Sequence, residues 1–218
     1  MRKTIIFILF ALCAMGAYAQ EESDDSLTIQ AVFNACVAMR DAAATNDTAS
    51  IMQAAEDLKN SGVRDFGNLR CKDDTLSSLN GHLVFSGEFA DSLAKGRDAY
   101  SMADEINRSS IHRGQTANGS ILTKTCFVKA GKSTKYSFAS KGRQELAVVA
   151  EAGGLVTMKV HATNRDGLDK RFDDTKNVKK GQPHRKVAFN LPSDRRNTVE
   201  VEILNRGKKD CSFVIISN

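Results

Sequence analysis

Residues 156–162 read VTMKVHA, and this alternation decides the fold of the second half of the chain. Apolar side chains occupy the even positions and polar side chains the odd ones. A period of two places successive side chains on opposite faces of a strand. One dry face and one wet face are typical of an antiparallel sheet that covers a core on one side.

Six more segments in this half alternate in the same way or are rich in β-branched residues: 122–128, 134–139, 145–152, 186–191, 199–204 and 212–216. Turn signals such as Lys141-Gly142 and Gly153-Gly154 separate most of them. About seven short strands within roughly 100 residues predict an antiparallel β-sandwich.

The first half of the chain has a helical pattern instead. Ser26 can cap a helix that reaches residue 44, and its apolar residues recur every three or four positions. The stretch Asn46-Asp47-Thr48 can cap a second helix that ends at Gly62. The predicted class is segregated α+β, an N-terminal helical domain followed by a C-terminal antiparallel β-sandwich. Two short strands and a third helix complete the first half, at 69–71, 82–85 and 88–106.

Charge changes sign where the secondary structure changes. Residues 20–110 carry 8 Lys and Arg against 16 Asp and Glu, a net charge of −8, whereas residues 111–218 carry 21 against 10, a net charge of +11. The stretch between the halves is polar and rich in turn residues, as linkers are. The predicted organisation is an acidic domain at 20–110, a linker at 111–120 and a basic domain at 121–218.

Residues 1–19 have the three parts of a cleavable secretory signal. Arg2 and Lys3 precede an apolar run at 5–15, and the small-x-small site Ala17-Tyr18-Ala19 follows. The apolar run is too short for a stable anchor, and no later segment is long and apolar enough to span a bilayer. We therefore expect export to the periplasm, the cell surface or the extracellular medium.

Four cysteines remain after this cleavage: Cys36, Cys71, Cys126 and Cys211. In an oxidising compartment an even number of cysteines indicates disulfide bonds. A zinc site is disfavoured, because the chain has no Cys-x-x-Cys pair. Three connectivities are open, and we expect Cys36–Cys71 and Cys126–Cys211, because each pair then lies within one predicted domain.

Lysines and arginines gather in the connections between the predicted strands. Such loops can converge at one end of a sandwich and attract polyanions. The candidates are acidic glycans, lipopolysaccharide, a protein partner or extracellular DNA. The scarcity of aromatic residues among these cations argues against base stacking on single strands, so a nucleic acid is the least favoured of them. The alternative is a solvated basic surface, or one neutralised by the acidic half. The predicted polyanion-binding residues are Lys170, Arg171, Lys179, Lys180, Arg185, Lys186, Arg195 and Arg196.

One polar loop offers oxygen ligands around a glycine turn, which is chemistry that calcium favours. Ala162 would occupy the first ligand position of an EF-hand, however, and Arg165 brings positive charge into the loop. A polar hairpin is the preferred interpretation, and no metal or cofactor is predicted. The weaker alternative is a metal site formed by Asn164, Asp166, Asp169 and Asp173.

The common catalytic motifs are missing from the sequence. It has no Gly-x-Ser-x-Gly elbow, no His-Glu-x-x-His helix and no glycine-rich phosphate loop. A hydrolase or hydrolase inhibitor of unfamiliar type stays an alternative. It requires a concave site in which a histidine meets carboxylates, with His82 or His112 near Asp73, Asp74 or Asp104.

A hydrophobic rhythm links Tyr136-Ser137-Phe138, the segments 146–149 and 199–203, and the closing run 211–216. In strand order and rhythm, residues 126–218 resemble the pre-peptidase C-terminal family, the small β-sandwiches of secreted bacterial peptidases. An immunoglobulin-like sandwich fits the same pattern. The resemblance implies an accessory or binding module rather than a catalytic one. We therefore expect an exported, non-catalytic binding or interaction protein, with a structural envelope component as a further alternative.

Overall fold

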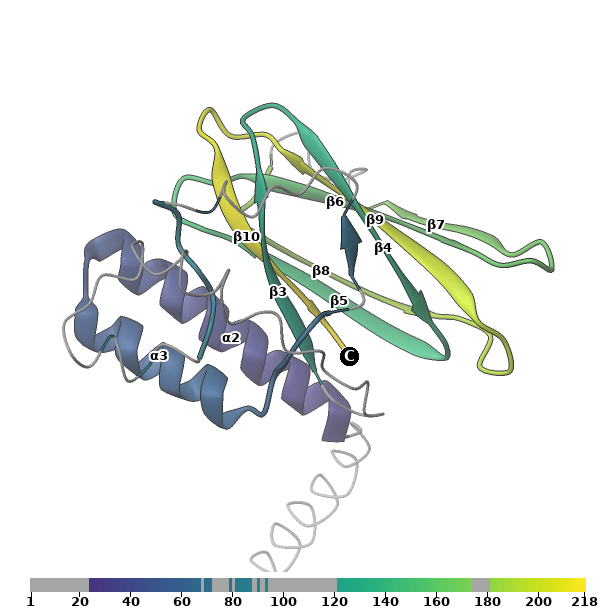
Figure 1. The fold of residues 1–218 in the computed structure, drawn as a ribbon, viewed down its shortest axis with the longest axis horizontal. Helices are drawn as coiled ribbons and strands as arrows, with labels where there is room; N and C mark the ends of the chain where they lie inside the picture. Colours follow the sequence, from purple (N-terminus) through teal and green to yellow (C-terminus); the bar gives the residue numbers. More distant parts are fainter. Residues whose placement is uncertain are drawn as a thin grey trace, which may run out of the picture.

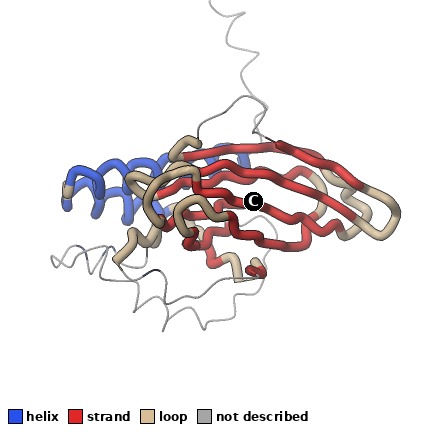
Figure 2. Tube along the Cα trace, turned by 90° about the horizontal axis from the view of Figure 1, so that it is seen from above, coloured by secondary structure: helices blue, strands red, loops and turns tan. Residues whose placement is uncertain are grey.

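The computed structural model describes residues 24–67, 69–71, 79, 81–87, 90, 93, 121–173 and 181–218. Two helices lie on one side of a set of long strands (Figures 1 and 2). The predicted α+β class is confirmed, because helices come first along the chain and mostly antiparallel strands follow. The predicted signal at 1–19 lies outside the described residues.

The two helices are α2 (Asp24–Thr45) and α3 (Thr48–Asn60), which pack against each other. Within the stretch 46–48 that was predicted to cap α3, the capping residue is Asp47, because its carboxylate accepts hydrogen bonds from the Ser50 amide at 3.1 Å and the Ser50 hydroxyl at 2.6 Å. These hydrogen bonds hold the pKa of Asp47 below its usual range. Neither described helix is long and apolar enough to cross a bilayer.

The strands form two five-stranded sheets. The helix-side sheet has the order β1-β3-β10-β5-β8, and the outer sheet has the order β2-β4-β9-β6-β7. Neighbours are antiparallel except for β1 and β3, which are parallel. The bounds are β1 (Arg64–Asp65), β2 (Arg70–Cys71), β3 (Leu122–Val128), β4 (Ser133–Ser140), β5 (Arg143–Ala150), β6 (Val156–Thr163), β7 (Asp169–Asp173), β8 (His184–Asn190), β9 (Asn197–Asn205) and β10 (Cys211–Ser217).

One apolar core lies between the two sheets. Along β9, the buried residues Val199, Val201 and Ile203 alternate with more exposed ones, as a period of two requires. Phe213 and Ile215 of β10 belong to the same core and come from the helix-side sheet. Burying one such side chain stabilises the fold by about 1.5–3 kcal/mol.

A second core joins the helices to the other face of the helix-side sheet. Val149 of β5 and Val214 of β10 pack there with Val32 and Met39 of α2. Both faces of β5 and β10 are therefore covered, which explains why β10 is buried along its whole length. The predicted linker at 111–120 lies outside the described residues, but the parts of the chain on its two sides share this core.

The predicted strands mostly coincide with observed ones, and each of the seven segments overlaps one of β3, β4, β5, β6, β8, β9 and β10. The segment at 82–85, expected as a strand, has no strand hydrogen bonding. The polar loop predicted at 164–173 contains the edge strand β7, which pairs with β6. The predicted third helix lies mostly outside the described residues.

The predicted disulfide bonds are not formed in the structure, where Cys36 and Cys211 are buried thiols. Cys36 lies in the core beside the helices, whereas Cys71 belongs to β2 of the outer sheet. Cys126 and Cys211 lie on neighbouring strands, but their direct partners are Phe213 and Val128. Cα atoms at such diagonal positions are about 7–8 Å apart, beyond the usual span of a disulfide. Disulfide formation in the protein stays a prediction.

Candidate functional site

A wide groove lies at the end of the two sheets where the chain turns after β4, β6 and β8. Its volume is about 1670 Å³. Residues from these turns line it together with Arg70, the beginning of β3 and the end of β10. The turns project at the right-hand end of Figure 1, beyond the helices (Figure 2).

The groove is strongly cationic. Each of its cationic side chains is exposed, and they come from four separate parts of the chain. Asp166 is the one acidic side chain among the described residues that line it. We call this site the cationic groove and define it by its cations, Arg70, Lys141, Arg143, Arg165, Arg195 and Arg196.

Carboxylates hold two of these arginines in place. Arg195 pairs with Asp166 at 2.9 Å and with Asp194 at 3.1 Å, and Arg143 pairs with Glu145 at 2.7 Å. The hydrogen bonds and charges of Asp194 and Asp166 raise the pKa of Arg195. The other four cations form no ion pair with a described residue, so their charge is available to a ligand.

Buried Asn197 ties the turns around the groove together. It is the first residue of β9 and is fully buried. Its side-chain amide donates hydrogen bonds to the carbonyl groups of Ser140, Pro192 and Arg195, at 3.1 to 3.2 Å. Its Oδ1 accepts a hydrogen bond of 3.2 Å from the side-chain amide of Asn164, which lies in the turn after β6. One side chain thus positions three turns that carry cations.

Gln144 holds the side of the groove around Arg143 in a similar way. It is buried at the start of β5, and its amide donates to the Ser217 hydroxyl at 2.8 Å and to Oδ1 of Asn218 at 2.7 Å. The Ser140 hydroxyl donates to Oε1 of the same side chain. The wall around Arg143 is therefore organised by buried hydrogen bonds, which reduce the entropy lost when a ligand binds.

Two aromatic residues, Phe66 and Phe138, are among the residues that line the groove, and their rings are covered. The rings of Phe66 and Phe138 meet edge to face with centroids 5.0 Å apart, and both side chains are buried. They are not available as a platform for stacking a sugar or base. Ser137 and Thr198 also line the groove and carry hydroxyl groups beside the cations. The chemistry offered to a ligand is charge and hydrogen bonding.

The predicted polyanion-binding residues do not form one surface. Arg195 and Arg196 lie in the cationic groove, whereas Lys170 and Arg171 lie on edge strand β7 and do not line it. Lys179 and Lys180 lie outside the described residues.

Arg185 and Lys186 lie on opposite faces of β8, so the two cannot share one binding surface. The prediction for Arg185 is wrong, because this residue is in phase with the inward-facing Val187 and Phe189 and is buried, with Nε donating to the Val156 carbonyl at 3.3 Å. Lys186 faces the helices, where its ammonium lies 5.2 Å from the centre of the Phe33 ring.

The alternative metal ligands are engaged in other contacts. Oδ1 of Asn164 accepts the amides of Asp166 and Leu168, both at 2.9 Å, which makes it the anchor of a tight turn. Asp166 pairs with Arg195, and Asp169 pairs with His161 at 2.8 Å. The side chain of Asp173 lies outside the described residues. Within the part of the chain that is described, no three His, Cys, Asp or Glu side chains gather as a metal site.

His82 meets a carboxylate that was not among those predicted. Its Nδ1 lies 2.5 Å from Oε1 of Glu151, a buried side chain that also accepts the amides of Leu83 and Ser212 at 2.8 Å. These hydrogen bonds attach residues 82–83 to the ends of β5 and β10. Glu151 therefore has a structural role, while His112, Asp73, Asp74 and Asp104 lie outside the described residues.

Four cations of the groove were missed by the sequence reasoning: Arg70, Lys141, Arg143 and Arg165. Each is isolated or in a short pair, whereas the sequence prediction rests on runs of basic residues. The order of the strands explains why their turns meet. Successive strands alternate in direction, so the connections after β4, β6 and β8 lie at the same end, but this grouping depends on β7, which the sequence did not predict.

No family model and no curated protein matches the chain. The distantly similar solved structures include TmCBM61 in complex with β-1,4-galactotriose, with 9% identity, a TM-score of 0.30, and coverage of 45% of this chain and 81% of that one. The Yersinia pseudotuberculosis-derived mitogen has 12% identity, a TM-score of 0.32, and coverage of 45% and 84%. A mutant of the periplasmic inhibitor of g-type lysozyme from Escherichia coli has 16% identity, a TM-score of 0.29, and coverage of 48% and 95%. Likenesses at this level carry no argument about ligand or activity.

Proposed function

We propose that this is an exported, non-catalytic binding protein, a β-sandwich module that holds an acidic polysaccharide in its cationic groove. One observation carries the proposal: six cationic side chains from four parts of the chain surround one groove that has a single acidic side chain among its described lining residues. Positive charge of this density attracts an anionic chain from a distance.

The kinds of side chain in the groove favour a carboxylated sugar. Five of the six cations are arginines, whose planar guanidinium groups bind carboxylates through two parallel hydrogen bonds. The hydroxyl groups of Ser137 and Thr198 can exchange hydrogen bonds with sugar hydroxyls. A polymer of uronic acids offers both groups in every residue.

Binding rather than catalysis is proposed because the polar groups of the groove serve to hold its shape. Asp166, which could act as a base, is paired with Arg195. Asn197 and Gln144 use their amides to join the turns. Export is proposed from the signal at 1–19, which would bring the protein to the compartment where surface and extracellular polysaccharides occur.

The test is calorimetric titration of the mature chain with a galacturonate trisaccharide, which is short enough to occupy the groove alone. We expect saturable binding that weakens as salt rises, because screening reduces the attraction of exposed charges. Replacement of two unpaired cations, Arg165→Gln with Arg196→Gln, should lower affinity about tenfold, the loss of about 1.4 kcal/mol. A neutral maltotriose should not bind.

The matched control is the variant Lys208→Gln with Lys209→Gln, which removes the same charge far from the groove. Its affinity for the trisaccharide should stay within about twofold of the natural chain. Equal loss of affinity in the two double variants would show a nonspecific effect of net charge. That result, or a failure of the trisaccharide to bind at all, would overturn the proposal.

A further inference from the structure

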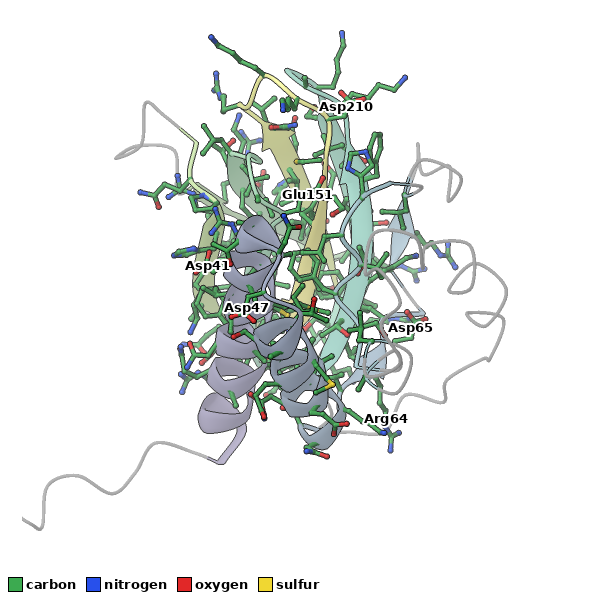
Figure 3. The ribbon with its side chains drawn as sticks, turned by 90° about the vertical axis from the view of Figure 1, so that its left-hand side faces the viewer. Asp41, Asp47, Arg64, Asp65, Glu151 and Asp210 are labelled. Carbon is green, nitrogen blue, oxygen red and sulfur yellow. The ribbon has the colours of Figure 1, made fainter. Side chains whose placement is uncertain are left out.

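The opposite end of the sheets carries a second group of cations. They come from the turn between β3 and β4 and the turn between β9 and β10, and all are exposed. None forms an ion pair with another described residue. Figure 3 shows Asp210 at this end, with nitrogen-tipped side chains extending outward around it. We call this surface the lysine end and define it as Lys129, Lys132, Arg206, Lys208 and Lys209.

Hydrogen bonds join the two turns into one surface. The Gly131 amide donates to the Asn205 carbonyl at 3.1 Å, and the Asn205 amide donates to the Lys132 carbonyl at 3.0 Å. The carboxylate of Asp210, the acidic residue of these turns, accepts the Ala130 amide at 2.8 Å. Asp210 therefore helps to hold the turns together, and five cations remain around it.

The face between the two cationic regions is balanced in charge. On the outer sheet, Lys135 pairs with Glu200 at 3.4 Å, and Lys159 lies directly opposite Glu202. His161 is bonded to Asp169 at 2.8 Å. On the other side, the helices cover the sheet. Among the described residues, the cations of this face thus lie beside acidic groups, whereas most cations at the two ends form no ion pair.

The two ends are far enough apart to act independently. β9 has nine residues and runs from one end to the other, so at 3.3 Å per residue its ends are about 26 Å apart. The Debye length at physiological ionic strength is about 8 Å. An anion bound at one end is screened from the other, and an anionic chain at each end can be held at the same time.

We propose that the protein is bivalent and bridges two stretches of acidic polysaccharide, one in the cationic groove and one on the lysine end. The inference rests on the proposed function of the groove and adds the second site and its consequence. Four of the five cations at the lysine end are lysines, flexible point charges that bind anionic groups without a fixed geometry. This end can therefore bind any nearby stretch of the same polymer. Because both sites belong to one protein molecule, binding at both cross-links two polysaccharide chains.

The experiment measures light scattering while polygalacturonate is titrated with the mature protein. Bridging produces a maximum of scattering at an intermediate ratio, because excess protein saturates each chain separately. The variant Lys129→Gln with Lys208→Gln and Lys209→Gln should lower the maximum about fivefold or more, while its calorimetric affinity for the trisaccharide stays within about twofold.

The possible outcomes separate the two proposals. Scattering by the lysine-end variant equal to that of the natural chain overturns bivalence and leaves groove binding intact. Scattering produced with the trisaccharide, which cannot bridge, would mean association of protein with protein and also overturns it. Failure of the trisaccharide to bind removes the proposed function itself. Loss of scattering in both the groove variant and the lysine-end variant supports bridging.

Discussion

The two ends of β9 are built alike but carry different chemistry. Asn197 begins the strand and Asn205 ends it, and both are fully buried. Asn197 joins the turns around the groove, while Asn205 donates to the Lys209 carbonyl at 2.8 Å and accepts the Gly207 amide at 2.8 Å. A buried asparagine thus satisfies the backbone groups of the turns at each end, as interior polar groups require.

The cations show how these similar frameworks differ. The groove has five arginines and one lysine around a concave site, whereas the lysine end has four lysines and one arginine on projecting turns. Arginine at a concave site selects an anion by geometry, and lysine on a turn attracts it by charge. A similarly fixed backbone at both ends thus supports a selective anion site in the groove and a less selective anion-binding surface at the lysine end.

The largest effect should come from damage to the scaffold that both ends share. Val149 is fully buried between α2 and the helix-side sheet. Val149→Asp places an unpaired carboxylate there and should cost more than about 4 kcal/mol, enough to unfold most of the protein. Urea denaturation followed by circular dichroism checks this, and both binding activities should be lost together.

The matched control for this variant is Leu155→Asp, since Leu155 is 37% exposed in a turn. Its free energy of unfolding should change by less than about 1 kcal/mol. If Val149→Asp unfolds no more easily than Leu155→Asp, the helices do not share a core with the sheet. The two ends would then be parts of a β domain that is stable on its own.

The next effect separates the ends. Asn197→Ala removes the amide whose two N–H groups serve three part-buried backbone carbonyls, so it should cost about 2–4 kcal/mol. The remaining folded protein should bind the trisaccharide at least about tenfold more weakly, because the turns are no longer held together. Calorimetry below the unfolding temperature measures this.

Asn205→Ala is the counterpart at the other end. It should destabilise the fold by a comparable amount, since Asn205 also bonds three backbone groups. Its affinity for the trisaccharide should match that of the natural chain, while bridging of polygalacturonate falls. Equal loss of trisaccharide binding in both variants would contradict the assignment of one asparagine to each end.

A smaller effect depends on pH and also tests the disulfide prediction. Burial, together with the charges of Glu151 and Asp210, raises the pKa of Cys211 from 9.0 to about 12. The folded state therefore keeps the proton that the unfolded state loses, so stability should fall as pH rises from about 9 towards 12, by up to about 1.4 kcal/mol per pH unit.

Urea denaturation at pH 8 and pH 10 measures this loss, with Cys211→Ala as the comparison. The natural chain should lose more stability than the variant between the two pH values. If oxidation joins Cys126 to Cys211, neither thiol can titrate and the difference disappears. Peptide mapping without reduction then identifies the bond. Either result shows whether Cys211 is a thiol or part of a disulfide bond.

The sequence was most informative where one periodicity acted alone. The alternation at 156–162 correctly predicts β6, and the capping stretch at 46–48 correctly predicts the start of α3. β7 was missed because Phe172 is its one apolar residue. The strand forms there because an edge position on β6 supplies hydrogen bonds whatever the side chains are.

The candidate site was less predictable, because it depends on which turns share an end. The basic pair Arg195-Arg196 is predicted from the sequence, but Arg165 enters the sequence argument only as a charge that disfavours a metal. Arg185 was misassigned because a charge in a basic run was assumed to be exposed, although its position matches the inward phase of β8. Asn197 and Asn205 share the inward phase of the apolar residues of β9, but they lie at the ends of the strand, where the sequence does not show whether the alternation continues.

The smallest predicted effect concerns Asp65 of β1, near the groove. Desolvation raises the pKa of this carboxyl, and the charge of Lys124 partly offsets the shift. Because the folded-state pKa is raised, the ionised carboxylate opposes folding at neutral pH, and this penalty disappears as pH falls through the folded pKa. Asp65 is largely exposed, so solvent weakens this effect, and Asp65→Asn should stabilise the protein only slightly at pH 7, by no more than about 0.5 kcal/mol, and not at pH 3. Thermal unfolding at the two pH values measures the difference.

The same change removes a negative charge beside the groove and none beside the lysine end, so trisaccharide affinity should rise slightly while the lysine end is unaffected. A variant that is less stable at pH 7 would show that the attraction of Lys124 outweighs the desolvation.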